Sequence, residues 1–247
     1  MNVKDPALAE ANRWATERLN RNCFCITLDR AALRSALDHE AGDTGFYDAF
    51  DNSRPHLFSN VPVFLSKSVI EEMRGIVDAI EAATKLPAYR DAVLSWAPEI
   101  AQQDFGPAGA LMGYDFHLGD DGPKLIEVNT NAGGAFLNAL LAKAQTACCA
   151  EVEQGLIGTR GNDFETSVVA MFKSEWRRQR DVGAPRRIAI IDDQPEGQYL
   201  YPEFVLARQL LLKHGIDAVI GDASELQYQG GRLLLASQEI DLVYNRL

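Results

Sequence analysis

The sequence predicts an α/β protein with α+β elements, built from a β-hairpin, a small parallel βαβ unit and flanking helices. Two alternating stretches separated by a cluster of turn residues predict the hairpin over residues 113–129. A short apolar run, a polar loop and an apolar helical stripe predict the βαβ unit within residues 187–247. Apolar residues at helical spacing elsewhere predict the helices.

Two helix starts are visible in the N-terminal part of the chain. Asp5 followed by Pro6 is typical of an N-cap and a first helical position, and apolar residues follow at helical spacing. Ser66 precedes a second apolar stripe, which continues to about Leu86. Between these helices, glycine and polar residues predict a loop over residues 41–60.

The hairpin is predicted from two strands, residues 113–118 and 123–129, joined by the turn cluster of residues 119–122. Alternation on the second strand places three side chains on one face: Leu125, Glu127 and Asn129. The apolar side chains of Ile126 and Val128 are predicted on the other face. One face of the hairpin is therefore mostly polar.

Asp115 lies on the first strand, where the hairpin brings it across from Glu127 and Asn129. Carboxylate and amide oxygens are hard ligands, and Mg²⁺ prefers a few of them together with the phosphates of a nucleotide. The spacing therefore favours a magnesium site at these three residues. An exposed strand whose carboxylates are only solvated explains the same spacing, and both interpretations stay open.

Gly133 and Gly134 follow the hairpin and precede a helix predicted over residues 135–150. Glycine lets the backbone approach a bulky anion, and a helix N-terminus attracts a phosphate or a carboxylate. We therefore expect an anion-binding turn at these two glycines.

A basic segment that carries glycine and proline, residues 177–187, predicts a linker. It divides the chain into two predicted domains, residues 1–180 with the hairpin and residues 187–247 with the βαβ unit. The predicted elements of the second half follow in order: helix 163–180, strand 188–191, polar loop 192–198, helix 204–214, strand 218–220, hairpin 226–235 and strand 240–244. The polar loop has no G-x-G-x-x-G pattern, which disfavours a Rossmann nucleotide-binding domain.

Composition excludes several classes of partner. The 247 residues carry 35 acidic and 24 basic side chains, and the net charge of -11 argues against a nucleic-acid backbone as the main partner. No uncharged apolar run approaches the ~18 residues that cross a membrane. The four cysteines form two close pairs without metal-site spacing, which predicts free thiols in a cytoplasmic protein.

Residues 113–134 resemble the metal-binding hairpin of the ATP-grasp superfamily. Its ligases carry an acidic residue on one strand and Glu-x-Asn on the next, before a glycine-containing turn, and these residues hold Mg²⁺ ions that bridge the phosphates of ATP. The resemblance implies three metal ligands: Asp115, Glu127 and Asn129. It also implies nucleotide contacts at four positions: Glu127, Asn129, Gly133 and Gly134.

The order of the elements resembles the circularly permuted branch of that superfamily, which includes eukaryotic-type glutathione synthetase and is related to glutathionylspermidine synthase. The resemblance covers residues 105–247 and implies that residues 187–247 form a βαβ substrate-binding domain. It assigns four substrate contacts: Asn131, Glu196, Gln198 and Arg246. Arg246 is also the expected catalytic residue, because a guanidinium at a strand end can take a carboxylate through two hydrogen bonds.

Two features depart from that branch. Gly113 stands where the synthetase has an arginine, which removes one carboxylate contact. The chain also ends at Leu247, before the lysine-bearing strands and the glycine-rich lid that hold ATP in the family. We therefore expect an incomplete ATP-grasp-like core, truncated at the C-terminus, with little or no ligase activity from this chain alone.

The resemblance implies an ATP-dependent carboxylate-amine ligase that needs Mg²⁺ and works through an acylphosphate. The expected substrates are a small-molecule carboxylate and an amine, such as an amino acid, a peptide or a polyamine, with no nucleic acid and no membrane as partner. The alternative is a non-catalytic small-molecule-binding α/β module formed by residues 187–247, in which Glu127 and Asn129 are solvated surface groups. Whether the protein forms a homodimer stays open.

Overall fold

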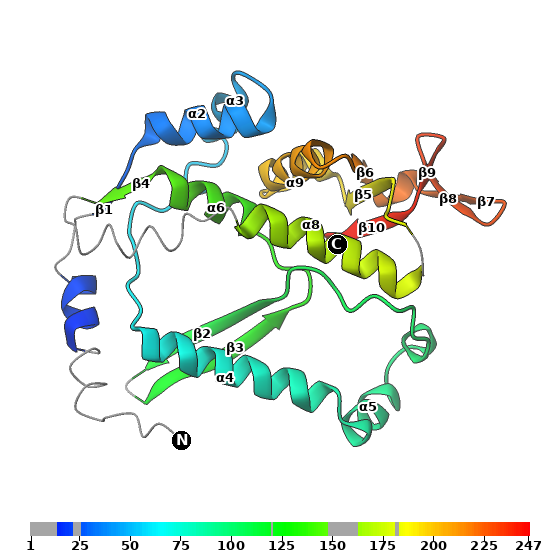
Figure 1. Cartoon of the computed structure of the whole chain (residues 1–247), viewed down its shortest axis with the longest axis horizontal. Coiled ribbons are helices and arrows are strands. Elements are labelled where there is room, and N and C mark those ends of the chain that lie inside the picture. Colours follow the sequence, from blue (N-terminus) through cyan, green and yellow to red (C-terminus); the bar gives the residue numbers. More distant parts are fainter. Residues whose placement is uncertain (1–13, 22–25, 120, 148–162, 181–182) are drawn as a thin grey trace. The chain divides into compact units, whose positions relative to one another are not determined.

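The computed structural model describes residues 14–21, 26–119, 121–147, 163–180 and 183–247 (Figure 1). The chain divides into two compact units, each described below by itself. Unit 1 comprises Met1–Phe24, Val61–Gly106 and Gly113–Asn129, and unit 2 comprises Cys25–Asn60, Pro107–Met112 and Thr130–Leu247. The predicted linker, residues 177–187, falls within unit 2, and the predicted division into functional domains on either side of it stays a prediction. The predicted N-cap at Asp5 and Pro6 lies outside the described residues.

A hairpin and one long helix make up most of unit 1. Its elements after the helical residues 14–21 are α4 (Lys67–Thr84), α5 (Pro87–Leu94), η1 (Glu99–Gln102), β2 (Gly113–Gly119) and β3 (Gly122–Asn129). β2 and β3 pair antiparallel, and α4 packs on β3. Ser66 caps α4, because its hydroxyl accepts a hydrogen bond from the Val69 amide at 3.3 Å. The predicted hairpin and the predicted cap are both confirmed.

A β-bulge interrupts the predicted alternation of β3. Asp115 pairs with Glu127. The next residue, Phe116, pairs with Leu125, which leaves Ile126 without a partner in the ladder. Because paired residues share a face and neighbouring residues alternate, Leu125 lies on the face opposite Glu127. The prediction that these two side chains share a face is wrong, because the extra residue at the bulge reverses the alternation of side chains between the two faces.

Unit 1 has little apolar core. Among its described residues, Pro123 is the one buried apolar residue. The apolar stripe of α4 is only half-buried, and no residue of that helix is fully buried. An isolated two-stranded hairpin is at best marginally stable in water, so this hairpin depends on its packing against α4. Unit 1 therefore derives little stability from apolar burial.

Unit 2 carries the main core and a parallel sheet. Its elements are β1 (Ile26–Leu28), α2 (Arg30–Ala41), α3 (Phe46–Asp51), α6 (Ala135–Ala144), β4 (Gln145–Ala147), α8 (Asp163–Gln179), β5 (Arg187–Asp192), η2 (Pro195–Gly197), α9 (Tyr201–Lys213), β6 (Asp217–Asp222), η3 (Ala223–Glu225), β7 (Gln227–Gln229), β8 (Arg232–Leu235), β9 (Gln238–Ile240) and β10 (Leu242–Asn245). The parallel sheet has the order β10-β5-β6, and α9 connects β5 to β6. The predicted α/β class and the βαβ unit are confirmed.

Both faces of β5 are covered. Four consecutive side chains of this central strand are buried to 1% exposure or less: Ile188, Ala189, Ile190 and Ile191. A continuous apolar run is typical of a parallel strand packed on both sides. The larger core cluster also draws buried side chains from helices on both sides of residues 177–187, such as Leu33, Phe136, Phe172 and Phe204. This shared core explains why the predicted linker does not separate two compact units.

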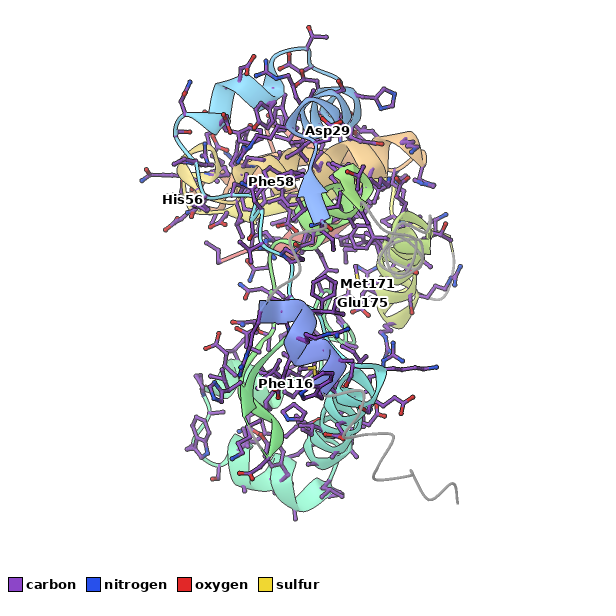
Figure 2. All side chains as sticks on the ribbon, turned by 90° about the vertical axis from the view of Figure 1, so that its left-hand side faces the viewer. Asp29, His56, Phe58, Phe116, Met171 and Glu175 are labelled. Atoms are coloured by element: carbon purple, nitrogen blue, oxygen red, sulfur yellow. The ribbon has the colours of Figure 1, made fainter. Side chains whose placement is uncertain are left out.

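The loop predicted over residues 41–60 contains α3, so that prediction is wrong there. Phe46, Tyr47 and Phe50 are buried in the core of unit 2, and the carboxylate of Asp38 accepts a hydrogen bond from the Tyr47 amide at 2.9 Å. Packing of these aromatic rings stabilises a short helix that local composition does not favour. Asp29 (Figure 2) is the N-cap of the preceding helix α2, because its carboxylate accepts hydrogen bonds from the amides of Ala31 and Ala32.

Two further boundaries differ from the predictions. The helix predicted over residues 135–150 ends at Ala144, because the next residues form β4 and pair antiparallel with β1. The strand predicted over residues 240–244 is broken at Asp241, which separates β9 from β10. The Asp241 carboxylate accepts hydrogen bonds from the amides of Arg186 at 2.7 Å and Arg187 at 3.1 Å. Within the described ranges, no helix is long and apolar enough to cross a membrane.

Candidate functional site

The polar face of the hairpin in unit 1 brings the three predicted metal ligands together. Asp115 on β2 lies directly opposite Glu127 on β3, and opposite residues in an antiparallel pair have neighbouring side chains. Asn129 lies two residues further along β3, and its Nδ2 donates a hydrogen bond to Glu127 Oε1 at 3.0 Å. Both carboxylates are exposed to solvent. Two carboxylates and one amide therefore share an open face.

These three side chains are too few to coordinate a metal ion without further ligands. They suit Mg²⁺, which commonly keeps water or phosphate oxygens among its ligands. No three His, Cys, Asp or Glu side chains gather in the described part of the chain in a way that could hold a metal. The hairpin instead offers two carboxylates and the Asn129 carbonyl oxygen, which stays free because the amide nitrogen bonds Glu127. Mg²⁺ usually takes one or two carboxylates and completes its shell with water or phosphate oxygens.

The turn that follows the hairpin is fastened to the C-terminal end of unit 2. Arg246 Nη1 donates hydrogen bonds to the backbone oxygens of Asn131 at 2.6 Å and Ala132 at 2.7 Å. In return, Asn131 Nδ2 donates to the backbone oxygen of Leu247 at 2.5 Å. The structure therefore brings together Asn131 and Arg246, two of the predicted substrate contacts.

Gly133 and Gly134 follow Asn131 and Ala132 in the turn that Arg246 binds. A Cβ atom at Gly133 would meet Arg246 Nη2 at 2.7 Å and would also collide with Leu200 Cδ1. Gly134 is the N-cap of α6 and has a φ of 93°, a left-handed conformation that favours glycine. The backbone conformation thus favours glycine at Gly134, whereas Gly133 leaves room for the ends of the Arg246 and Leu200 side chains.

The predicted anion seat at the start of α6 is occupied by the protein's own Glu203. One oxygen of this carboxylate accepts a hydrogen bond from the Gly134 amide, and the other accepts from the Phe136 amide at 3.4 Å. Burial raises the pKa of the Glu203 carboxyl above its ordinary value, although these amides and the charge of Arg246 act in the opposite direction. Sequence reasoning missed Glu203, and the one local signal was a carboxylate next to the apolar run of α9.

The guanidinium of Arg246 is half-buried and packed between aromatic rings. Its Cζ lies 5.6 Å from the ring centroid of Phe204 and 5.4 Å from that of Tyr244. The Tyr244 hydroxyl accepts a hydrogen bond from Arg246 Nη1 at 3.3 Å. Burial raises the pKa of Tyr244 to about 12, with the positive charge of Arg246 opposing it. Arg246 is thus contacted on several sides and directed at the turn.

The loop after β5 carries the other two predicted substrate contacts, Glu196 and Gln198. The Glu196 side chain is exposed, whereas Gln198 Nε2 donates to the backbone oxygen of Asp193 at 2.6 Å. Arg54 donates to the backbone oxygens of Tyr199 and Gln198, each at 2.9 Å. No sequence signal pointed to Arg54, because it lies more than a hundred residues away along the chain.

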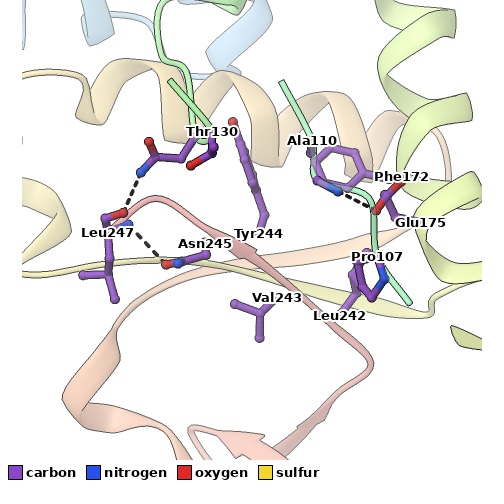
Figure 3. Close-up of a pocket in the computed structure, with 12 residues that line it drawn as sticks. Pro107, Ala110, Thr130, Phe172, Glu175, Leu242, Val243, Tyr244, Asn245 and Leu247 are labelled. Carbon is purple, nitrogen blue, oxygen red and sulfur yellow. Dashed lines mark hydrogen bonds between the residues drawn. The ribbon is translucent and has the colours of Figure 1, made fainter. Parts of the chain in front are cut away.

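A cavity of about 230 Å³ lies in unit 2 along β10 (Figure 3). Its polar lining includes Thr130 and Asn245, and its apolar lining includes Phe172 and Val243. The carboxylate of Glu175 fixes one wall, because it accepts hydrogen bonds from the amides of the two residues after Pro107, at 2.7 Å and 3.1 Å. This volume lies below the roughly 300–1,000 Å³ of sites for drug-sized ligands, so the cavity suits only a smaller molecule.

Comparison with known proteins adds no assignment. No family model matches the chain, and no curated protein is similar enough to match it. The hairpin face, the turn and the cavity are the features from which a function can be inferred.

Proposed function

We propose that this chain serves an ATP-dependent carboxylate-amine ligase reaction of the glutathione synthetase-like type, with an ATP-grasp-like metal site on its hairpin. One observation carries the proposal. Asp115 pairs directly with Glu127 on an exposed hairpin face, and the Asn129 amide bonds the Glu127 carboxylate. This arrangement offers hard oxygen donors for a divalent ion and leaves room for the phosphates of a nucleotide.

In this proposal the hairpin residues bind and orient, and no side chain acts as a nucleophile. Asp115, Glu127 and Asn129 would hold Mg²⁺, which offsets negative charge on the phosphates of ATP when it is bound. A substrate carboxylate oxygen attacks the γ-phosphorus of ATP, and ADP leaves as the acylphosphate forms. An amine then attacks the acyl carbon, phosphate leaves, and the nitrogen loses a proton to water. Such a reaction depends on positioning and on charge stabilisation, which rigid strand residues can supply.

The proposed substrates are small. The cavity along β10 has Thr130 and Asn245 among its polar lining residues, next to apolar ones, and we propose that it takes an amino acid, a short peptide or a polyamine. Arg246, Glu196 and Gln198 remain proposed substrate contacts. Arg246 would have to exchange one of its backbone bonds for a substrate carboxylate, and such charge-assisted pairs are about twice as strong as neutral hydrogen bonds.

Calorimetric titration with MgATP tests the proposal. Glu127→Ala should weaken the affinity for MgATP by at least about tenfold, because it removes one metal-binding carboxylate. Asp121→Asn is the matched control, since Asp121 is an exposed carboxylate of the same hairpin that pairs with Lys124 at 3.3 Å. Equal affinities for the two variants would reject the proposed metal site.

A second candidate function is a non-catalytic small-molecule-binding α/β module. The cavity in unit 2 favours it, because none of the residues that line the cavity belongs to the hairpin. In this case Glu127→Ala leaves MgATP binding unchanged, whereas filling the cavity by Thr130→Trp abolishes binding of a small ligand.

A further inference from the structure

Glu203 is the most deeply buried charged side chain among the described residues, with 1% of its surface exposed. It lies in the first turn of α9, and its carboxylate reaches the N-terminus of α6. Gly134 has no side chain with which to cap that helix, so Glu203 supplies the cap from another helix. The carboxylate therefore ties the turn before α6 to α9.

Arg246 holds the same turn from its other side. Glu203 accepts from the amides of Gly134 and Phe136, whereas Arg246 donates to the carbonyl oxygens of Asn131 and Ala132. The negative charge of Glu203 also attracts the guanidinium. The backbone N–H groups of this short turn and the start of α6 are thus bound by the negative Glu203, and its backbone carbonyl groups by the positive Arg246.

The turn is closely packed against Arg246 at Gly133. Gly133 lies between the two charges, and a Cβ atom there would meet Arg246 Nη2 at 2.7 Å. The ring of Phe204, the residue next to Glu203, stacks against the Arg246 guanidinium at 5.6 Å. A displacement of the Glu203 carboxylate should therefore move the Arg246 guanidinium, both through the turn that the two side chains bind and through Phe204 on α9.

We propose that Glu203 is a positioning residue: its carboxylate fixes the turn from Asn131 to Gly134 and thereby sets the direction of the Arg246 guanidinium. Glu203 is buried and does not face a ligand itself, so it acts through Arg246 and the turn. The proposal deepens the proposed function, on which the role of Arg246 as a carboxylate contact rests. The position of the guanidinium can be measured without any ligand, which separates the two claims.

The Nε–Hε resonance of Arg246 in ¹⁵N–¹H spectra, identified by its loss in Arg246→Lys, reports this position. In Glu203→Gln the charge is lost and the side-chain nitrogen opposes one backbone N–H. We expect the resonance to move and the Gly134 and Phe136 amides to exchange at least about tenfold faster. An unmoved resonance in this folded variant would overturn the proposal.

Two controls separate positioning from general stability. Glu165→Gln removes the ion pairs of another glutamate in unit 2, with Lys213 at 2.9 Å and Lys143 at 3.4 Å, and should leave the resonance in place. Leu211→Ala creates a cavity in the core and should also leave it in place. Movement in either control to the same extent as in Glu203→Gln would show that the shift reports destabilisation, and this would overturn the proposal.

Gly133→Ala tests the same geometry if Glu203→Gln does not fold. Its Cβ pushes only on the ends of the flexible side chains of Arg246 and Leu200, so the variant should fold. We expect the Arg246 resonance to move here too, and an unmoved resonance would overturn the proposal. If the resonance moves but MgATP binding does not depend on Glu127, the ligase function fails and the positioning role of Glu203 stands.

Discussion

Replacing Arg54 by alanine should release the loop that carries Glu196 and Gln198. Arg54 donates hydrogen bonds at 2.9 Å to the backbone oxygens of Gln198 and Tyr199, and a longer one at 3.4 Å to that of Glu196. A hydrogen bond to a charged group contributes about 1.5–3 kcal/mol net. Because Arg54 is half-buried, water can form some of the hydrogen bonds that the carbonyl oxygens lose when the guanidinium is removed. We therefore expect Arg54→Ala to lower the free energy of unfolding by about 2–3 kcal/mol.

Lysine at the same position should recover about half of that loss, because an ammonium group cannot serve two carbonyl oxygens through a planar fork. Urea unfolding followed by circular dichroism measures both variants. Arg34→Ala is the matched control: Arg34 forms an exposed ion pair with Asp48 at 2.7 Å, which contributes less than about 1 kcal/mol.

A local measurement accompanies the global one. Chymotrypsin cleaves after tyrosine, so cleavage after Tyr199 should be faster in Arg54→Ala than in Arg34→Ala if the loop is released. Equal free energies of unfolding and equal cleavage rates for the two variants would refute the reasoning that Arg54 orders this loop.

Three further outcomes are expected. Ser66→Ala removes the cap of α4 and should cost unit 1 about 1 kcal/mol, seen as faster amide exchange at Val69; unchanged exchange would show that the cap contributes nothing. Leu211→Ala, at a fully buried site, should cost about 2–5 kcal/mol in urea unfolding, and a loss below about 1 kcal/mol would contradict the assigned core. The hydrogen bond from Lys213 lowers the pKa of the Glu165 carboxyl, against the opposing effect of burial. This stabilisation is full above the unfolded-state pKa and is lost as pH falls through the folded-state pKa, so Glu165→Gln should flatten the acid side of the stability profile measured by urea unfolding. An unchanged acid side would contradict that ion pair.

The parallel sheet could be predicted from local sequence because its signal is dense. The apolar run of β5, the helical stripe of α9 and the glycine turn between β7 and β8 each identify their element without tertiary information. The hairpin of β2 and β3 was equally visible, and so was the Ser66 cap. These elements have consistent local propensity and burial.

Features that depend on distant residues could not be predicted. α3 forms because Phe46 and Phe50 find a core built from later parts of the chain. The bulge at Ile126 changes the face of Leu125, and alternation alone cannot reveal an extra residue. Glu203 occupies the helix N-terminus where the sequence predicts a ligand anion, and nothing in the local sequence indicates which helix, some seventy residues away, this carboxylate caps.

The central claim is that a divalent ion binds on the hairpin, and a titration with Mn²⁺ followed by NMR tests it most directly. Mn²⁺ is a paramagnetic substitute for Mg²⁺ and broadens the resonances of the amides nearest to it. The account predicts that, in the presence of ATP, the resonances of Asp115, Glu127 and Asn129 disappear first, at a small fraction of one equivalent. Broadening that begins instead at the acidic loop ends of the parallel sheet, around Asp193 and Asp222, would contradict a divalent-ion seat on the hairpin.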